Sequence, residues 1–405
     1  MPPGPSRPRR VLIISASMGA GHDGAARELA SRIAEAGHDV EVRDFLDSGP
    51  LHMGAALRRG YEFELRHAPA AYDATYRFWH RAPWLCPLVA WLVAALSRRR
   101  VLRWVGASRL RRTRLSSSQT AARAADVVVS TYPLATLALG RLRRQGRLRV
   151  PVVNFITDFG VHPLWVHKGV DVNLAVHRRP AEVASSRSGR PSLACGPVVS
   201  SAFHRPSPEE RSLARARFGL LPADRAVLIV AGSWGIGEVE ETLRAVAGSG
   251  RRYVPVVVCG SDDQLLARMQ ACTAGLRSRS VVLGWTDQMP AIMAACDALV
   301  ENAGGLTSLE AFRSGLPVVS YQPIAGHGKE NTAAMAAAGV SRFAGDAEDL
   351  AIALEAVTSD CPEKWVQVAT AAEMFADDGA ALVLAVAGDT SLIPSPVPGA
   401  WQPAR

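Results

Sequence analysis

Cysteine, aromatic residues and long apolar runs are scarce in this chain of 405 residues. The six cysteines are scattered and form neither a CxxC pair nor a disulfide-like pattern, so we expect buried free thiols in a reducing compartment. No apolar run reaches the ~18 residues that a membrane-spanning helix needs. The N-terminal segment, MPPGPSRPRR, lacks the apolar core of a secretory signal. Together these absences predict a cytoplasmic protein.

Motifs for metals and nucleic acids are also missing. His162, His167 and His177 do not repeat a one-turn interval and HExxH is absent, so we predict no metal site. The formal net charge is +9, but no zinc finger, aromatic RNA-binding signature or basic-zipper heptad accompanies it. Nucleic acid is therefore not the expected partner.

What is present indicates two globular domains. The hydrophobic content is 48%, and the length is sufficient for two cores. Residues 1–200 hold 30 Lys or Arg and 14 Asp or Glu, whereas the remainder holds 16 and 23, so a basic half is joined to an acidic one. The predicted division is a disordered tail (1–10), a first domain (11–195), a linker (196–210), a second domain (211–388) whose final helix can return to the first, and a disordered tail (389–405).

Short apolar runs alternate with small-residue turns and helical segments. Continuous apolar strands are typical of a parallel sheet that is buried on both faces. The pattern predicts an α/β fold with strands at 11–15, 38–44, 125–130, 150–156, 226–231, 254–259, 280–283 and 298–300.

One strand–turn–helix segment, from Cys296 to Asn331, has the clearest chemistry. Gly304 and Gly305 precede a helix over 306–314, and glycines there let the chain approach an anion with unpaired N–H groups. Glu310 lies one turn into that helix, where a carboxylate can accept from ribose hydroxyls. The turn around Ser233 repeats the arrangement. The alternative is an ordinary strand-to-helix turn.

A second loop carries His22, in the sequence SMGAGH after the first strand. A neutral imidazole at the mouth of a glycine-rich loop suits a general base, because its usual pKa lies near neutral pH. The alternative is a polar surface residue.

Trp84 to Arg114 has a different character. Its first part is apolar nearly all round, and eight arginines follow: Arg98, Arg99, Arg100, Arg103, Arg109, Arg111, Arg112 and Arg114. This suits a helix that lies in an anionic membrane interface. The alternative is a buried helix followed by a solvated basic one.

Five motifs occur together in this chain: SMGAGH, TDFGVHPLWVHKGVDVNLAVH, GWTDQM, GGLTSLEAFRSGLPVV and PIAGHGKEN. Through them the chain resembles the family 28 glycosyltransferases over roughly residues 10–345. That family includes monogalactosyldiacylglycerol synthases, processive diacylglycerol glucosyltransferases and the lipid II-forming N-acetylglucosaminyltransferase. The resemblance implies the GT-B fold, in which two Rossmann-like domains face each other across a cleft.

The resemblance also implies roles for particular residues. His22 would be the catalytic base, and Asp158, at the end of a cleft-facing strand, is the second catalytic candidate. The acceptor side of the cleft would be lined by His162, Pro163, Trp165 and His167. The donor-binding residues would be Gly21, Ser233, Trp285, Met289, Gly304, Gly305, Thr307, Glu310, His327, Glu330 and Asn331.

The implied reaction is inverting transfer of a hexose from a UDP-sugar to a lipid acceptor such as diacylglycerol, at the inner face of the cell membrane. Backbone amides would offset the diphosphate charge, and with no DxD motif the resemblance requires no metal or other cofactor. Related enzymes commonly have Gly-Gln-Glu-Lys-Glu-Asn where this chain has Gly-His327-Gly328-Lys-Glu-Asn. The sugar, the acceptor, the number of sugars added and the oligomeric state stay open. A noncatalytic UDP-sugar-binding membrane-associated protein and a nucleotide-sugar epimerase are the alternatives.

Overall fold

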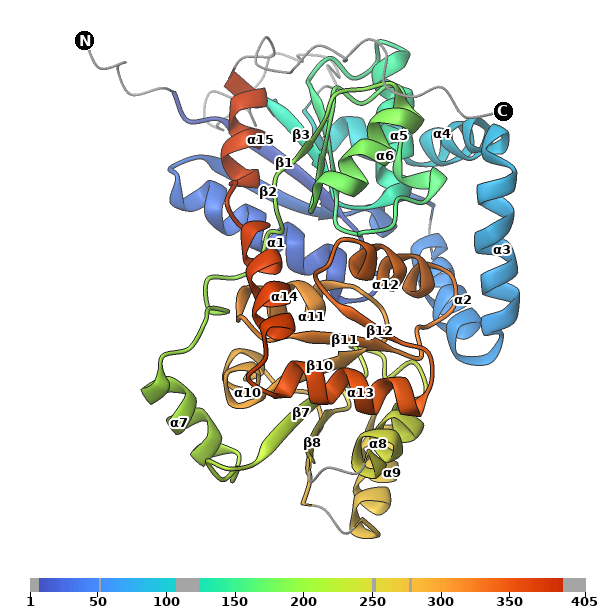
Figure 1. Cartoon of the computed structure of the whole chain (residues 1–405). Coiled ribbons are helices and arrows are strands. Elements are labelled where there is room, and N and C mark those ends of the chain that lie inside the picture. The colour runs from blue at the N-terminus through green and yellow to red at the C-terminus, as the bar shows by residue number, and fades with distance from the viewer. Residues whose placement is uncertain (1–6, 51, 107–123, 250–252, 277–278, 389–405) are drawn as a thin grey trace, which may run out of the picture.

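The chain folds around two six-stranded parallel sheets, one in each half of the molecule (Figure 1). The computed structural model describes residues 7–50, 52–106, 124–249, 253–276 and 279–388. The first sheet has the order β2-β1-β3-β4-β5-β6 and the second has the order β12-β11-β10-β7-β8-β9. The strands are β1 (Arg10–Ser15), β2 (Asp39–Asp44), β3 (Val127–Ser130), β4 (Val152–Ile156), β5 (Val172–Ala175), β6 (Ser192–Ala194), β7 (Arg225–Val230), β8 (Tyr253–Val258), β9 (Val281–Leu283), β10 (Ala298–Glu301), β11 (Val318–Tyr321) and β12 (Arg342–Ala344).

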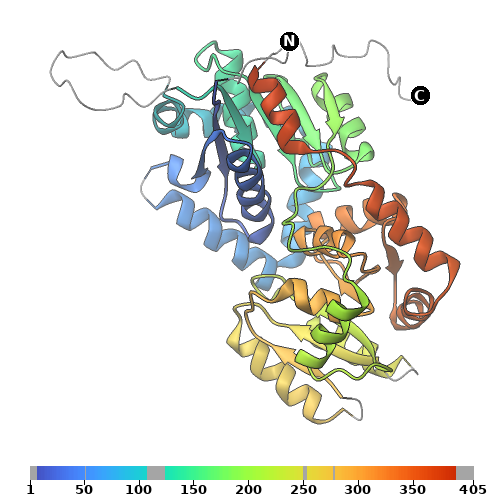
Figure 2. The same cartoon turned by 90° about the vertical axis from the view of Figure 1, so that its left-hand side faces the viewer.

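Helices cover both faces of each sheet, as Figure 2 shows from the side. In the first half they are α1 (Ala20–Glu35), α2 (Met53–His67), α3 (Pro69–Arg81), α4 (Cys86–Trp104), α5 (Pro133–Arg144) and α6 (Arg178–Ser188). Those that follow are α7 (Pro208–Arg217), α8 (Val239–Gly248), α9 (Asp263–Ala274), α10 (Met289–Ala295), α11 (Leu306–Arg313), α12 (His327–Ala337), α13 (Ala347–Thr358), α14 (Pro362–Glu373) and α15 (Gly379–Gly388).

Strand β1 shows why the buried strands are continuously apolar. Leu12 and Ile14 face a core formed with α4 and α5, whereas Val11 and Ile13 face a core formed with α1 and α15. Successive side chains of a strand point to opposite faces, so a sheet covered on both faces has no solvated side to fill with polar residues. Strands β7 and β10 in the second sheet divide their side chains between two cores in the same way.

The C-terminal helical segment of the chain is two helices. The break lies between α14 and α15. Gly379 begins α15, and a Cβ on Gly379 would lie 2.9 Å from a ring carbon of Phe155. From there α15 packs against α1 and β3 of the first domain (Figure 1). The two halves are therefore joined by two crossings of the chain.

Strand β1 and helix α7 begin at residues that the predicted domain limits placed in the tail and in the linker. Strand β1 starts at Arg10, and the backbone N–H of Arg9 donates to Nδ1 of His38 over 3.1 Å, so these residues belong to the folded part and not to the tail. Helix α7 starts at Pro208, inside the predicted linker, because Ser207 and Glu210 cap its N-terminus reciprocally. Residues 1–6 and 389–405 lie outside the described ranges.

Helix α4 is two-sided. Ala90, Ala94 and Val101 are buried on one face, while Leu88, Trp91 and Leu92 are exposed on the other. The prediction of an interfacial helix and the alternative of a buried helix therefore each fit only one face of α4. Of the eight arginines, Arg98, Arg99, Arg100 and Arg103 lie on α4, and Arg109, Arg111, Arg112 and Arg114 lie outside the described residues. Among the described helices, none is both long and apolar enough to cross a bilayer.

Candidate active site

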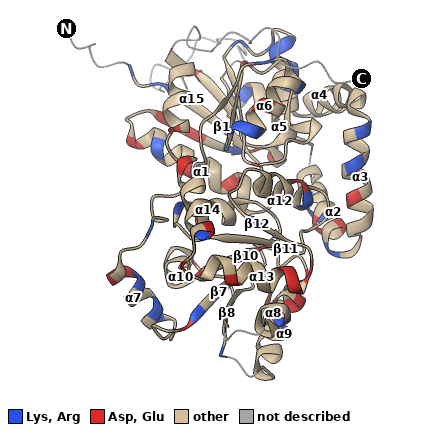
Figure 3. Ribbon diagram, viewed as in Figure 1, with Lys and Arg blue, Asp and Glu red and all other residues tan. Residues whose placement is uncertain are grey.

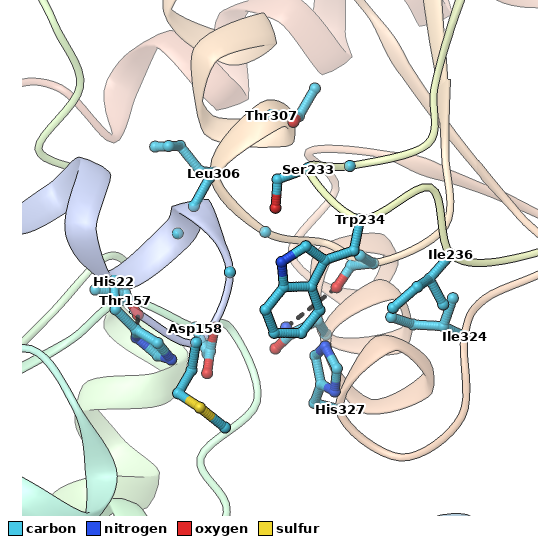
Figure 4. Close-up of a pocket in the computed structure, with 18 of the residues that line it drawn as sticks. His22, Thr157, Asp158, Ser233, Trp234, Ile236, Leu306, Thr307, Ile324 and His327 are labelled. Carbon is cyan, nitrogen blue, oxygen red and sulfur yellow. Dashed lines mark hydrogen bonds between the residues drawn. The ribbon is translucent and has the colours of Figure 1, made fainter. Parts of the chain in front are cut away.

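A cavity of about 630 Å³ lies between the two domains, a size typical of small-molecule sites. It is bordered by loops that follow the carboxyl ends of β1, β4, β7 and β10, where open α/β sheets bind ligands. Figure 4 shows residues of both domains facing it. Of the residues predicted from the sequence, those that line it are Gly21, His22, Asp158, His162, Trp165, Ser233, Trp285, Met289, Gly305, Thr307, Glu310, His327 and Asn331.

His22 sits in the first turn of α1, directly after the loop that leaves β1. Gly19, at φ +91°, makes the turn that starts this helix. The imidazole Nδ1 lies 3.3 Å from Oγ1 of Thr157, and the ring stands edge-on to both Tyr132 and Trp165. Burial lowers the pKa of His22, and the charge of Asp158 opposes that effect only in part. The imidazole is therefore neutral near pH 7 and able to accept a proton.

Asp158 is held beside His22 by an indole. It follows β4, and its Oδ2 accepts a hydrogen bond of 2.9 Å from Nε1 of Trp165. Burial raises the pKa of Tyr72 to about 12 and lowers the pKa of His327, and the negative charge of Asp158 adds to the first effect and opposes the second. The carboxylate therefore acts on side chains from both domains.

The glycine turn before α11 is organised by Glu301, which the sequence analysis did not single out. Its Oε2 accepts from the backbone N–H groups of Ala303 and Gly304, over 2.8 and 2.5 Å, and its Oε1 accepts from Ser320. Gly304 has φ +63°, and a Cβ there would lie 2.6 Å from Cβ of Asn331. Gly304 is thus required by packing against α12 and does not line the cavity, whereas Gly305 does.

Glu310 carries an unpaired carboxyl on the second-domain side of the cavity. It lies on α11 and lines the cavity, and its carboxyl has no hydrogen bond within the described part of the chain. Burial raises the pKa of Glu310 to about 8. A carboxyl that is withdrawn from water and left without a partner is available to a polar ligand. Ser233 and Thr307 face the cavity nearby (Figure 4).

Three tyrosines from α2 and α3 complete the cavity wall. Tyr61, Tyr72 and Tyr76 line it from the first domain and reach residues of α12 in the second. No motif in the sequence predicted that α2 and α3 contribute to the site. Tyr72 and Tyr76 are four residues apart and share one helix face, which was the only local signal.

Four predicted site residues lie outside the cavity lining. Pro163 is buried in a short 3₁₀ turn, between His162 and Leu164, which do line the cavity. His167 is directed toward Gly140 of α5, and its Nδ1 accepts from the N–H of Gly169, because the 3₁₀ turn redirects the chain. Gly304 is used in packing. Glu330 accepts a hydrogen bond from the hydroxyl of Tyr76 and lies 3.3 Å from Nε2 of His80.

Two family models match parts of this chain. Residues 100–191 match the family model of monogalactosyldiacylglycerol (MGDG) synthase, and residues 225–360 match that of glycosyl transferases group 1. A processive diacylglycerol beta-glucosyltransferase of Bacillus subtilis is 30% identical over 210 residues, which are 51% of this chain and 53% of that protein. The chain is related to the family 28 glycosyltransferases. The match spans about half the length of such curated relatives.

Solved structures show the GT-B fold. MurG of Acinetobacter baumannii superposes with a TM-score of 0.53 at 16% identity, over 95% of this chain and 99% of that one. The glycosyltransferase SnogD of Streptomyces nogalater gives 0.56 at 16% identity, over 94% and 100%. These likenesses confirm the predicted GT-B arrangement of two Rossmann-like domains.

The structure explains one departure from the pattern of related diacylglycerol glycosyltransferases. Gly328 is buried in the first turn of α12, and a Cβ there would lie 2.5 Å from Cγ1 of Ile324 and 3.0 Å from the carbonyl oxygen of Asn302. A side chain at this position would have to displace Ile324.

Proposed function

We propose that this chain is an inverting glycosyltransferase that moves a hexose from a UDP-sugar to a lipid hydroxyl, with diacylglycerol as the model acceptor. One observation carries the proposal. A neutral, half-buried His22 from one domain shares a cavity with the unpaired carboxyl of Glu310 and the N-terminus of α11 from the other. A base and a nucleotide-binding half on opposite sides of one cleft suit transfer between two substrates.

The donor would lie against the second domain. Glu310 would accept hydrogen bonds from the ribose hydroxyls, and the N–H groups at Gly305 and near Ser233 would contact the diphosphate, aided by the positive end of α11. Trp285 and Met289 border the cavity at the expected position of the uracil ring. The processive beta-glucosyltransferase activity named for the Bacillus subtilis relative supports a nucleotide-sugar donor.

The chemical step would be a single displacement. His22 removes the proton of the acceptor hydroxyl, whose oxygen then bonds to the anomeric carbon while the bond from that carbon to the diphosphate breaks. UDP leaves with the bonding pair, and an α-linked donor gives a β-linked product. Backbone amides aimed at the diphosphate offset the developing charge, so the step as written requires no metal.

The acceptor would reach the cleft from a membrane surface formed by η2 (Pro83–Leu85) and α4. Trp84 is 73% exposed and Trp91 is 52% exposed, with Leu88 and Leu92 beside them. Arg99, Arg100 and Arg103 are exposed further along α4, and Figure 3 shows further basic residues on α3. Apolar side chains beside arginines suit an anionic interface.

The deciding experiment is incubation with labelled UDP-glucose, UDP-galactose and UDP-N-acetylglucosamine, each with and without diacylglycerol vesicles. We expect a labelled glycolipid that depends on the acceptor. An epimerised donor without glycolipid would indicate an epimerase. Nucleotide binding without turnover of any donor would indicate a noncatalytic UDP-sugar-binding protein. Either of the last two results would overturn the proposal.

A further inference from the structure

The α2–α3 hairpin of the first domain reaches across the cleft to the second domain. Oδ1 of Asp73 accepts from the backbone N–H of Gly326 over 3.0 Å and lies 3.4 Å from Nζ of Lys329. Arg66 pairs with Asp262 at 3.0 Å. Figure 1 shows α2 beside α12. These contacts place the hairpin against the N-termini of α9 and of α12, the helix that begins at His327.

Two hydroxyls of this hairpin converge on one nitrogen. Oη of Tyr72 lies 3.1 Å from Nδ1 of His327, and Oη of Tyr61 lies 3.5 Å from the same atom. The two phenol rings stand edge-on to each other, and Tyr61 also packs against Trp234. Two tyrosine side chains of the first domain therefore border the imidazole of His327.

The contact favours one tautomer of His327. A phenol donates its hydroxyl proton readily, and a neutral imidazole accepts at the nitrogen that carries no proton. Burial lowers the pKa of His327, so the ring is neutral near pH 7. With Nδ1 accepting from Tyr72, the proton resides on Nε2. Within the described part of the chain, Nε2 has no hydrogen bond, and the ring lines the cavity beside Trp234 and Ile324 (Figure 4).

We propose that Tyr72, assisted by Tyr61, positions His327 so that its Nε2–H donates to a hydroxyl of the donor hexose, and that this bond sets which hexose is accepted. The inference rests on the proposed function, since it concerns the sugar end of the same donor. His327 stands where related diacylglycerol glycosyltransferases commonly have glutamine, and a side chain at position 328 would have to displace Ile324. The chain therefore relies on the imidazole and on residues from the other domain for contacts to the sugar.

The test compares donor preference in wild type, Tyr72→Phe, His327→Leu and the double variant. The preference is the ratio of kcat/KM for whichever of UDP-glucose and UDP-galactose the wild type uses better to that for the other, and calorimetry with UDP alone measures the nucleotide contacts. A misdirected hydrogen bond to a substrate hydroxyl reduces discrimination by about 3- to 10-fold. We expect Tyr72→Phe to lower the ratio by that factor with UDP affinity unchanged, His327→Leu to lower it further, and Tyr72→Phe to add nothing to His327→Leu.

Tyr253→Phe is the matched control, because it removes a buried phenol hydroxyl that contacts Thr358 far from the cavity. Its donor preference should equal that of wild type. Tyr61→Phe serves as the second variant if Tyr72→Phe does not fold, and it should lower the ratio less. An unchanged ratio in both tyrosine variants, an equal further loss in the double variant, or a wild-type enzyme that accepts the two sugars equally would overturn the inference. A wild-type chain that binds neither UDP nor any UDP-sugar would instead overturn the proposed function.

Discussion

Nε1 of Trp165 donates to Oδ2 of Asp158 over 2.9 Å, and the same indole packs edge-on against His22 at a centroid distance of 5.6 Å. One side chain therefore fixes the carboxylate and borders the imidazole. The negative charge of Asp158 raises the pKa of His22 against the larger effect of burial. Asp158 thus influences the base without a direct hydrogen bond to it in the described structure.

The first prediction concerns Asp158→Asn. Removing the carboxylate removes a favourable interaction with the imidazolium, so the pKa of His22 should fall further. The rising limb of the pH dependence of kcat should then move to lower pH. If Asp158 were itself the base, the substitution would abolish turnover and the limb would disappear. An unchanged pH dependence of kcat would show that Asp158 does not affect the pKa of His22.

The second prediction concerns Glu310→Ala. Two charge-assisted hydrogen bonds to ribose contribute about 1.5–3 kcal/mol each, so calorimetry should show UDP affinity reduced by tenfold or more with the fold intact. Because the pKa of Glu310 is about 8 and the ligand favours the carboxylate, wild-type UDP affinity should rise with pH up to about that value. The variant should lose this dependence. Unchanged UDP affinity would remove Glu310 from the site.

The raised pKa of Glu310 also predicts how the free energy of unfolding changes with pH. The pKa of Glu310 is about 8 in the folded chain, above its ordinary value of 4.5. Its contribution to the free energy of unfolding is therefore complete below pH 4.5 and is lost as the pH rises toward 8. Denaturant unfolding of the ligand-free protein should show this decline in wild type but not in Glu310→Ala.

The third prediction concerns Gly328→Ala. Its Cβ would lie too close to Ile324 and Asn302, and such overpacking costs about 1–3 kcal/mol. The midpoint of denaturant unfolding should fall. Gly60→Ala on α2 is the matched control, because a Cβ there meets no atom within 4 Å, and it should leave stability unchanged or raise it. Equal stability of the two variants would contradict the packing argument.

The fourth prediction concerns the membrane surface. Each Lys or Arg near an anionic leaflet gains on the order of 1 kcal/mol, and salt screens that attraction. Co-sedimentation should be stronger with anionic than with neutral vesicles and should weaken at high salt. Replacing Trp84 and Trp91 with Ser should reduce it, whereas Leu213→Ser, at an equally exposed apolar site on α7, should not. Equal binding to both vesicle types at both salt concentrations would refute this surface.

The parts of the structure that could be predicted are those with local signals. Residues 11–15 and 226–231 are continuously apolar because both faces of each strand are covered, and their positions as β1 and β7 match within one residue. The turn at Gly304 and Gly305 was also visible in the sequence. The need for glycine at position 304 was not visible, because it comes from close packing against Asn331 on a different helix.

What the sequence did not reveal depends on contacts between distant segments. Tyr72 meets His327 across 255 positions, and nothing around residues 53–81 indicates that this hairpin faces the cavity. The family resemblance implied that His167 lines the cleft, but after the turn at 163–165 its side chain lies against Gly140. Glu330 was assigned to the donor, yet its carboxylate contacts Tyr76 of the other domain.

The most direct test of the account is the turnover of His22→Ala with UDP-sugar and diacylglycerol vesicles, measured beside calorimetric UDP affinity. Loss of a positioned general base lowers the rate by about 10²–10⁴-fold, and UDP affinity should stay near wild type because the proposed nucleotide contacts lie in the second domain. Near-full turnover of His22→Ala would contradict the mechanism, and Asp158 would then be the remaining candidate for the base.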